Sequence, residues 1–199
     1  MDWILDMDRE LFLFLNGLNT EWLDPLMMLF TQTQFWVPLY LFLIYLIFKN
    51  YGTEGWFVLA GVVVTILLAD QITSSLMKPF FARLRPSHEP SLAGLVHLVD
   101  GYAGGRYGFA SSHAANTFGT AWFIWKLFGT RYRWIGLMFV WCTLMTYTRV
   151  YLGVHYPGDV IVGALVGIGS GAIGWQVYQA LRKKFKSQDL TVDNSNPRT

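Results

Sequence analysis

The sequence predicts an all-α membrane protein, a bundle of about five transmembrane helices preceded by a helix that lies at the membrane surface. Two observations support this fold class. First, 53% of the 199 residues are hydrophobic and only 14% are charged, which is too apolar for an ordinary soluble domain. Second, the charged residues cluster, so that long apolar runs remain between them, as in proteins that cross a bilayer several times.

The N-terminal residues 1–24 are expected to contain the interfacial helix. Residues 3–18 mix acidic and basic side chains with leucine and phenylalanine, which is typical of an amphipathic helix and too charged for a span. The apolar run 36–48 is shorter than the ~20 residues that a span needs. The first span should therefore begin near Pro25 and pass through the polar residues 31–34, and Pro38 could kink it.

Four clearer apolar runs predict four further spans. They cover residues 56–77, 110–128, 134–148 and 159–181. The second and third of the five spans are joined by a long connection, residues 78–109. We expect one membrane-embedded domain over residues 1–186, followed by a polar tail, residues 187–199, that is disordered.

Basic residues predict which end of the bundle faces the cytoplasm. They follow the first and fifth spans and flank the loop between the third and fourth: Lys49, Lys126, Arg131, Arg133, Arg182, Lys183, Lys184 and Lys186. With five spans these positions share one side, and their excess of positive charge makes that side cytoplasmic. The 78–109 connection and the 149–158 turn therefore face outward together. A net charge of only +2 gives no reason to expect a nucleic-acid partner.

The outward turn between the last two spans carries Arg149, His155 and Asp159 in the pattern Arg-x5-His-x3-Asp. Pro157 is a favourable first residue of a helix, which places Asp159 in the first turn and His155 just before it. A carboxylate at that spacing can accept the Nδ1 proton of the imidazole and leave Nε2 free as a nucleophile. The alternative is a surface histidine that caps a helix.

Two more outward segments carry polar motifs. Lys78 and Arg85 belong to a Lys-x6-Arg-Pro pattern in which two prolines should interrupt the helix and fold both cations toward one point. Ser111 and Ser112 are good helix N-caps, and the helix N-terminus beside His113 would bind an anion. The alternatives are basic anchors for lipid headgroups, which is how we interpret Arg83, and serine caps beside an interfacial histidine.

Together, these motifs resemble those of the type 2 phosphatidic acid phosphatase superfamily, which are Lys-x6-Arg-Pro, Pro-Ser-Gly-His and Ser-Arg-x5-His-x3-Asp. The first motif is intact here, the second reads Ala110-Ser111-Ser112-His113, and the third has Thr148 in place of serine. The resemblance covers residues 56–181 and implies the same helical membrane fold.

The resemblance also implies a role for each motif residue. His155 would attack phosphorus and form a phosphohistidine, and Asp159 would orient it. His113 would protonate the leaving oxygen and then activate water. The phosphate oxygens would be held by Lys78, Arg85, Arg149, Ser111 and the backbone around Ser112. No metal and no cofactor would be needed.

The expected activity is removal of a terminal phosphate from a lipid phosphate or pyrophosphate that enters from the bilayer. With its outward-facing site the chain resembles bacterial members that act on undecaprenyl pyrophosphate, phosphatidylglycerophosphate or lipid A, and the motifs do not choose among these. We expect the site at the extracytoplasmic, periplasmic face of the plasma membrane. The alternatives are a lipid phosphotransferase and a non-enzymatic lipid transporter or scaffold.

Small and polar residues inside the spans predict how the helices pack. Gly163, Gly167 and Gly171 form a small-residue stripe, which we expect to pack within the bundle of a monomer, with a dimer as the alternative. Asp70, Ser74 and Lys78 recur every four residues and should share one inward face of their helix, where Asp70 has a hydrogen-bonded structural role.

Overall fold

The computed structural model describes residues 2–195, and the surroundings of the side chains from residue 3 to residue 185. Its helices are α1 Asp2–Asn16, α2 Asp24–Phe30, α3 Val37–Tyr51, α4 Gly55–Asp70, α5 Lys78–Phe81, α6 Ser112–Phe128, α7 Leu137–Tyr151 and α8 Pro157–Ser195. A π-helical segment, Gln71–Met77, joins α4 to α5 without a break. The described residues contain no β-strand, only an isolated bridge between Leu84 and Tyr107. The predicted all-α class is confirmed.

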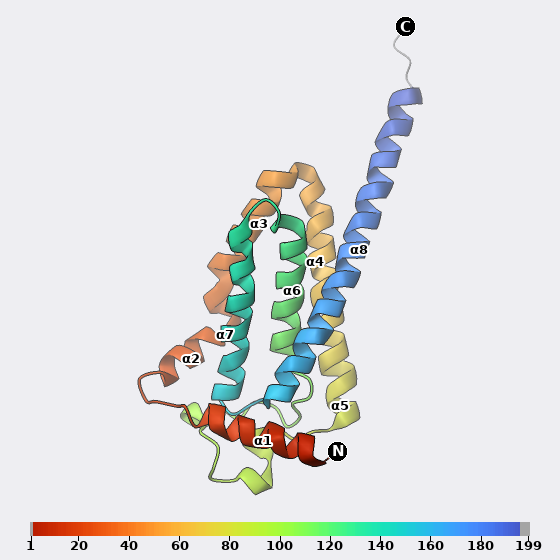
Figure 1. The fold of residues 1–199 in the computed structure, drawn as a ribbon. Helices are drawn as coiled ribbons and strands as arrows, with labels where there is room; N and C mark the ends of the chain where they lie inside the picture. The colour runs from red at the N-terminus through yellow and green to blue at the C-terminus, as the bar shows by residue number, and fades with distance from the viewer. Residues whose placement is uncertain (1, 196–199) are drawn as a thin grey trace.

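Five long helices, α3, α4, α6, α7 and α8, stand side by side as a bundle, with α6 packed against both α4 and α8 (Figure 1). Small residues permit the closest approach. The backbone of α8 at Gly163 and Gly167 lies directly against the carbonyl oxygens of Ser111, the N-cap of α6, and Ala115, in the first turn of α6. A Cβ atom on Gly171 would lie 2.7 Å from the Gly119 oxygen. The predicted packing of this stripe within the bundle is confirmed.

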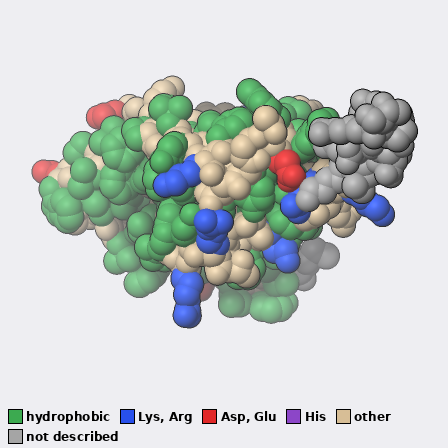
Figure 2. Space-filling view, turned by 90° about the horizontal axis from the view of Figure 1, so that it is seen from above, with side chains coloured by type: hydrophobic (Ala, Val, Ile, Leu, Met, Phe, Trp, Pro, Cys, Tyr) green, Lys and Arg blue, Asp and Glu red, His purple; other side chains and the backbone are tan. Residues whose placement is uncertain are grey.

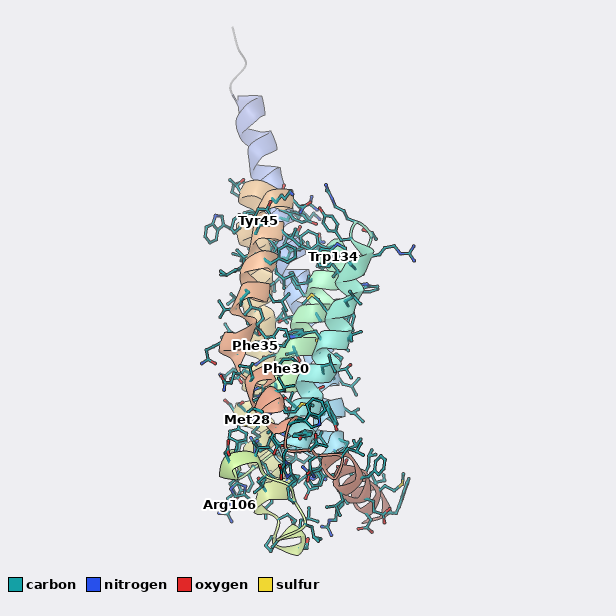
Figure 3. The ribbon with its side chains drawn as sticks, turned by 90° about the vertical axis from the view of Figure 1, so that its left-hand side faces the viewer. Met28, Phe30, Phe35, Tyr45, Arg106 and Trp134 are labelled. Atoms are coloured by element: carbon teal, nitrogen blue, oxygen red, sulfur yellow. The ribbon has the colours of Figure 1, made fainter. Side chains whose placement is uncertain are left out.

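The predicted first span is wrong in one respect, because it is not a continuous helix. Helix α2 ends at Phe30, Gln32 is extended, and a 3-10 turn over Thr33–Trp36 leads into α3. Pro38 lies in the first turn of α3 and does not kink it. Phe30 and Phe35 stack across the break, their ring centroids 5.3 Å apart (Figure 3), and Trp36 Nε1 donates to the Phe30 oxygen at 2.8 Å. These contacts stabilise the interruption.

Two helical regions, Thr33–Phe81, which includes the turn between α3 and α4, and Pro157–Phe185, are long and apolar enough to cross a membrane by length and composition. Large apolar side chains also face outward on the bundle, among them Leu41, Val140 and Leu165, each more than half exposed. Such a surface suits lipid better than water. The chain is therefore treated as a membrane protein, and the number of spans, five, stays a prediction.

The predicted N-terminal amphipathic helix is present as α1. It lies across the lower end of the bundle, next to the start of α8 (Figure 1). Its inner face buries Phe12 completely against Tyr156, with ring centroids 5.4 Å apart. Its outer face exposes Trp3 and Phe14, each 65% accessible, which suits a headgroup boundary.

Helix α8 extends beyond the predicted end of the domain. A disordered tail from Ser187 was expected, but the helix continues to Ser195 and projects past the other helices (Figure 1). No proline follows Pro157 until Pro197, so nothing in the chain removes a helical donor before that point. The remaining predicted tail, 196–199, lies outside the described residues.

Lysine and arginine side chains gather at the end of the bundle that carries the α3–α4 and α6–α7 connections (Figure 2). Lys49 and Lys126 lie in the last turns of α3 and α6, and Arg182 on α8 pairs with Glu54 at 2.9 Å. Trp134 and Tyr45 lie near this end, whereas Arg106 lies at the other (Figure 3). This distribution agrees with the positions from which the cytoplasmic side was predicted, and the sidedness itself stays a prediction.

Candidate active site

The predicted outward segments meet at the end of the bundle opposite the lysine-rich end (Figure 1). They are α5 and the connection after it, the N-terminus of α6, and the turn between α7 and α8. Backbone hydrogen bonds hold them together. Arg85 N donates to the Arg106 oxygen at 3.1 Å, Ser87 N to the Gly153 oxygen at 3.0 Å, and Ser111 N to the Asp159 oxygen at 3.0 Å. All eight predicted site residues belong to these segments or to the helix ends beside the turn, where Arg149 lies in the last turn of α7 and Asp159 in the first turn of α8.

His155 and Asp159 form a buried pair, 1% and 0% exposed. His155 Nδ1 lies 3.3 Å from Asp159 Oδ2, and the same oxygen accepts the backbone N–H of Tyr156 at 3.0 Å. The histidine contact is at the long end for a hydrogen bond, as is common before substrate is bound. Because Pro157 begins α8, Asp159 lies in its first turn beside His155. The geometry leaves Nε2 of His155 unused by this pair.

The environment of His155 favours its neutral form. Burial lowers the pKa of His155 well below its ordinary value, and the positive charges of Arg85, Arg149 and Lys78 lower it further. A backbone hydrogen bond at Gly108 opposes this effect without reversing it. A neutral imidazole whose Nδ1 proton is held by a carboxylate can act as a nucleophile through Nε2.

Arg149 is held rigidly from two sides. It is 3% exposed, Nη1 donates to Thr31 Oγ1 at 2.6 Å, and Nη2 donates to the Tyr102 hydroxyl at 3.1 Å. Its Nε is buried and has no hydrogen-bond partner among the described residues. Burying a hydrogen-bond donor without an acceptor costs free energy, so this N–H group is available to an acceptor on a bound ligand.

Arg85 and Lys78 are also fixed by neutral groups. Arg85 is 8% exposed and donates through Nε to the Tyr107 oxygen at 3.1 Å and through Nη1 to the Val154 oxygen at 3.3 Å. Burial lowers the pKa of Arg85, and the nearby charge of Arg149 lowers it further. Lys78 Nζ donates to Ser112 Oγ at 2.7 Å. Within the described part of the chain, no carboxylate forms an ion pair with these three cations.

Helix α6 points its N-terminus at the same place. Ser111 is its N-cap and accepts from Ala114 N at 3.5 Å, while Ser112 Oγ lies 3.0 Å from Thr73 Oγ1 and 2.9 Å from Ser74 Oγ. His113 follows in the first turn. The free N–H groups and the positive end of a 17-residue helix favour an anion here.

The predicted inward face of α4 and its continuation is confirmed. Ser74 Oγ donates to Asp70 Oδ1 at 3.1 Å, and Lys78 Nζ lies 3.4 Å from Ser74 Oγ. The break after Lys78 differs from the prediction, because the helix continues through Pro79 to Phe81 and ends where Ala82 adopts a left-handed conformation, φ 46°. The π-helical turns just before Pro79 remove the usual conflict between a proline and the preceding carbonyl groups.

A cavity of about 620 Å³ leads from the side of the bundle to His113. Apolar residues of α3, α4, α6 and α7 form most of its wall, among them Leu59, Val62, Ile66 and Trp141. Its polar end is formed by Ser112, His113, Asn116 and Asp70. The cavity can hold an apolar chain whose polar end reaches the N-terminus of α6.

Sequence reasoning missed several residues that build the site. Arg83, interpreted above as a headgroup contact, instead binds Asp159 Oδ1 at 2.8 Å and Asp8 Oδ2 at 2.7 Å. Gly108 lies so close to the pair that a Cβ atom on it would be 3.0 Å from Asp159 Oδ2. Thr31 and Tyr102 hold Arg149. The glycine-rich stretch 101–108 could have indicated a close backbone approach at Gly108. Nothing in the local sequence indicates that Thr31 and Tyr102 bind Arg149.

Nothing in the described residues resembles a metal centre, because no three His, Cys, Asp or Glu side chains converge on one point. The site consists instead of two buried arginines, a half-buried lysine, a helix N-terminus and two histidines. Such a set is chemically able to bind the oxygens of a phosphate and to supply a nucleophile and a proton donor. With the apolar exterior of the bundle, the fold and the site define a membrane lipid phosphatase.

The chain belongs to the PAP2 superfamily, whose family model matches residues 55–183. It is 41% identical over 181 residues to a lipid A 4′-phosphatase of Bacteroides thetaiotaomicron, covering 89% of this chain and 78% of that protein. A lipid A 4′-phosphatase of Porphyromonas gingivalis is 38% identical over 189 residues, covering 93% of this chain and 78% of the relative.

Solved structures share the fold. A crystal structure of LpxE from Aquifex aeolicus superposes with a TM-score of 0.65 at 28% identity, covering 84% of this chain and 93% of that chain. A phosphatidylglycerolphosphate phosphatase of the PAP2 type from Bacillus subtilis gives a TM-score of 0.62, covering 92% and 88% of the two chains. At 21% identity this second likeness supports the fold alone.

Proposed function

We propose that this protein removes a single phosphate from a phosphorylated glycolipid of the lipid A class, through a phosphohistidine on His155, at the outer leaflet of a bacterial plasma membrane. The observation that carries the proposal is the group of cations formed by the buried arginines Arg85 and Arg149 and the half-buried Lys78, which has no ion-paired carboxylate among the described residues. Charges buried without counter-ions are strongly unfavourable, and a phosphate group would compensate them.

The reaction begins when Nε2 of His155 attacks phosphorus. The bond between phosphorus and the lipid oxygen breaks, and His113 donates a proton to that oxygen as it leaves. Asp159 accepts the Nδ1 hydrogen bond and stabilises the positive charge that forms on the imidazole. The cations and the N-terminus of α6, with Ser111 and the backbone at Ser112, bind the phosphate oxygens as negative charge builds up.

The second step returns the enzyme to its starting state. His113, now neutral, takes a proton from water, and the resulting hydroxide attacks the phosphorus of the phosphohistidine. The N–P bond breaks, inorganic phosphate leaves, and the electron pair returns to Nε2 of His155. Every proton in this cycle is carried by His113 or water, and the three cations neutralise the charge that a metal ion would otherwise neutralise on the phosphate oxygens.

The cavity beside His113 supports a lipid substrate. Its wall is apolar and its polar end lies at the α6 N-terminus, so one acyl chain of the substrate would lie between the helices with its phosphate near Ser112 and His113. Among the lipid phosphates considered from sequence, lipid A is favoured because two relatives, 41% and 38% identical, are named lipid A 4′-phosphatases.

The orientation belongs to the same proposal. Five spans, α3, α4, α6, α7 and α8, would place the lysine-rich end in the cytoplasm and the site at the periplasmic face, with α1 at the headgroup level. The protein would act there as one domain over residues 1–186.

The test is purified protein assayed in micelles against lipid A carrying two phosphates, undecaprenyl pyrophosphate and phosphatidylglycerophosphate. We expect loss of one phosphate from lipid A, identified by mass spectrometry, with free phosphate released in the absence of any acceptor lipid. Faster turnover of another substrate would reject the lipid A assignment. Transfer of phosphate only when an acceptor lipid is present would show a phosphotransferase.

The role of the cavity has its own test. Val62→Phe should raise the KM for a long-chain lipid phosphate and leave hydrolysis of a small soluble aryl phosphate unchanged, because only the lipid needs the cavity. Val140→Phe, on the lipid-facing side of α7, is the matched control and should change neither. Equal KM values for the lipid in Val62→Phe and the native protein would exclude the cavity as the acyl site.

A further inference from the structure

Helix α1 is attached directly to the turn that carries the nucleophile pair. Asp8 Oδ1 accepts the backbone N–H of Gly158, in the first turn of α8, at 2.7 Å. Its other oxygen, Oδ2, accepts from Arg83 Nη2 at 2.7 Å. Asp8 therefore caps α8 and, with the same carboxylate, holds the guanidinium that binds Asp159.

Arg83 is fixed between two carboxylates. Nη1 donates to Asp159 Oδ1 at 2.8 Å, its guanidinium carbon lies 4.0 Å from the ring centroid of Tyr156, and its carbonyl oxygen accepts from Gly108 N at 3.0 Å. The side chains of Asp8, Arg83 and Asp159 are 12%, 22% and 0% exposed. This ion-paired group is too enclosed for a loosely held lipid anchor.

We propose that Asp8 and Arg83 are positioning residues for catalysis, which set the orientation and the effective charge of Asp159 toward His155. The inference rests on the proposed roles of His155 and Asp159. Arg83 occupies Oδ1 of Asp159 and so turns Oδ2 toward Nδ1 of His155. Asp8 balances the charge of Arg83, so that Asp159 keeps enough negative charge to stabilise the imidazolium.

This arrangement gives the two residues opposite electrostatic effects. Removing the negative charge of Asp8 leaves Arg83 paired with Asp159 alone, which disfavours a positive His155 and lowers the pH at which His155 becomes protonated. Removing the positive charge of Arg83 favours a positive His155 and raises that pH. Both changes also loosen Asp159, and a misplaced catalytic group can cost up to about 100-fold in rate.

The other charged or titratable groups around His155 come from four further elements and stay unchanged in these variants. They are Lys78 of α5, Arg85 of the following connection, His113 of α6 and Arg149 of α7. Lys78, Arg85 and Arg149 set a constant positive background and His113 is the same in every variant, so a difference between variants reports the Asp8–Arg83 bridge.

The experiment measures kcat and KM against pH for Asp8→Asn, Arg83→Gln, the double variant and Arg83→Lys, in the full chain. We expect kcat to fall roughly 10- to 100-fold in all four with KM little changed. The acidic limb of kcat/KM should move to lower pH in Asp8→Asn, to higher pH in Arg83→Gln, and return toward the native position in the double variant. Arg83→Lys keeps the charge but cannot bridge two carboxylates, so its limb should stay in place.

Three controls separate this inference from its alternatives. Asp6→Asn removes an exposed carboxylate of the same helix and should behave as the native protein, and Asp8→Glu should recover part of the lost kcat. Melting temperature and vanadate affinity identify any variant that fails to fold. Native kcat in Asp8→Asn and Arg83→Lys, with His155→Ala inactive, would overturn the positioning role alone. Turnover in His155→Ala would overturn the proposed function.

Discussion

The hydrogen bond from Arg149 to Thr31 predicts that a residue far from the sequence motifs controls turnover. Thr31 lies at the break between α2 and α3, is 7% exposed, and accepts from Arg149 Nη1 at 2.6 Å. Thr31→Val keeps the shape and removes the acceptor. A hydrogen bond to a charged group is worth about 1.5–3 kcal/mol, and the abandoned donor would stay buried.

The size of the effect follows from that energy. If the bond holds Arg149 in place for the transition state, losing about 1.5–3 kcal/mol lowers kcat/KM roughly 10- to 100-fold, at 1.36 kcal/mol for each factor of ten. Thr31→Ser keeps an acceptor and should recover most of the rate. The rate is read as phosphate release from a lipid phosphate in micelles, beside a melting curve for each variant.

Thr143→Val is the matched control for this prediction. Thr143 is exposed on α7, and its hydroxyl donates only to the Phe139 oxygen at 2.9 Å. It should keep the native kcat/KM. Native kcat/KM in Thr31→Val would refute the reasoning, because the rate would then not need the hydroxyl acceptor. A loss in Thr31→Ser as large as that in Thr31→Val would also refute it, because serine keeps the acceptor.

Three further predictions concern pH, metals and topology. Burial and the charges of Arg85, Arg149 and Lys78 lower the pKa of His155 below its ordinary 6.5, so the nucleophile stays neutral. The acidic limb of the kcat/KM profile should therefore lie below pH 6.5, and a limb above pH 6.5 would contradict this environment. Activity should survive excess EDTA and be inhibited by vanadate, whereas loss that magnesium restores would show a metal enzyme. In a Cys142→Ser background, Ala93→Cys should react with an impermeant thiol reagent in intact spheroplasts, whereas Thr130→Cys should react only after lysis. The reverse pattern would show that the predicted topology is wrong.

The parts of the fold that sequence predicted are those set by local pattern. The apolar runs 56–77, 110–128, 134–148 and 159–181 are bounded by charged or turn-forming residues, and each is occupied by a long helix. The first predicted span is interrupted at Gln32, and Thr31 beside this break binds Arg149, 118 residues away in sequence. A pattern read over neighbouring residues contains no information about that partner.

The same distinction explains what was found and missed at the site. His155 and Asp159 are four residues apart, so their proximity follows from a helix that begins at Pro157. Arg83 binds groups 75 and 76 residues away, Asp8 and Asp159, and alone it resembles a basic lipid anchor. Its two carboxylate partners became visible only when the chain was folded.

His97 illustrates a polar residue whose role depends on tertiary structure. Its Nε2 lies 2.9 Å from Asp24 Oδ1, which also accepts from the Tyr151 hydroxyl at 2.6 Å. Burial opposes ionisation of Asp24, but the hydrogen bonds from Tyr151 and His97 lower its pKa overall. The cluster joins α2, the outward connection and α7, and nothing near His97 in the sequence predicts it.

The central claim is that His155 carries the phosphoryl group and His113 handles the proton. The most direct measurement is quenched-flow labelling with radioactive substrate, followed by peptide mapping. We expect an acid-labile, base-stable label on His155, none in His155→Ala, and accumulation of the label in His113→Ala with an aryl phosphate, whose good leaving group needs no proton in the first step. A label on Ser111, or one that persists in His155→Ala, would contradict the account.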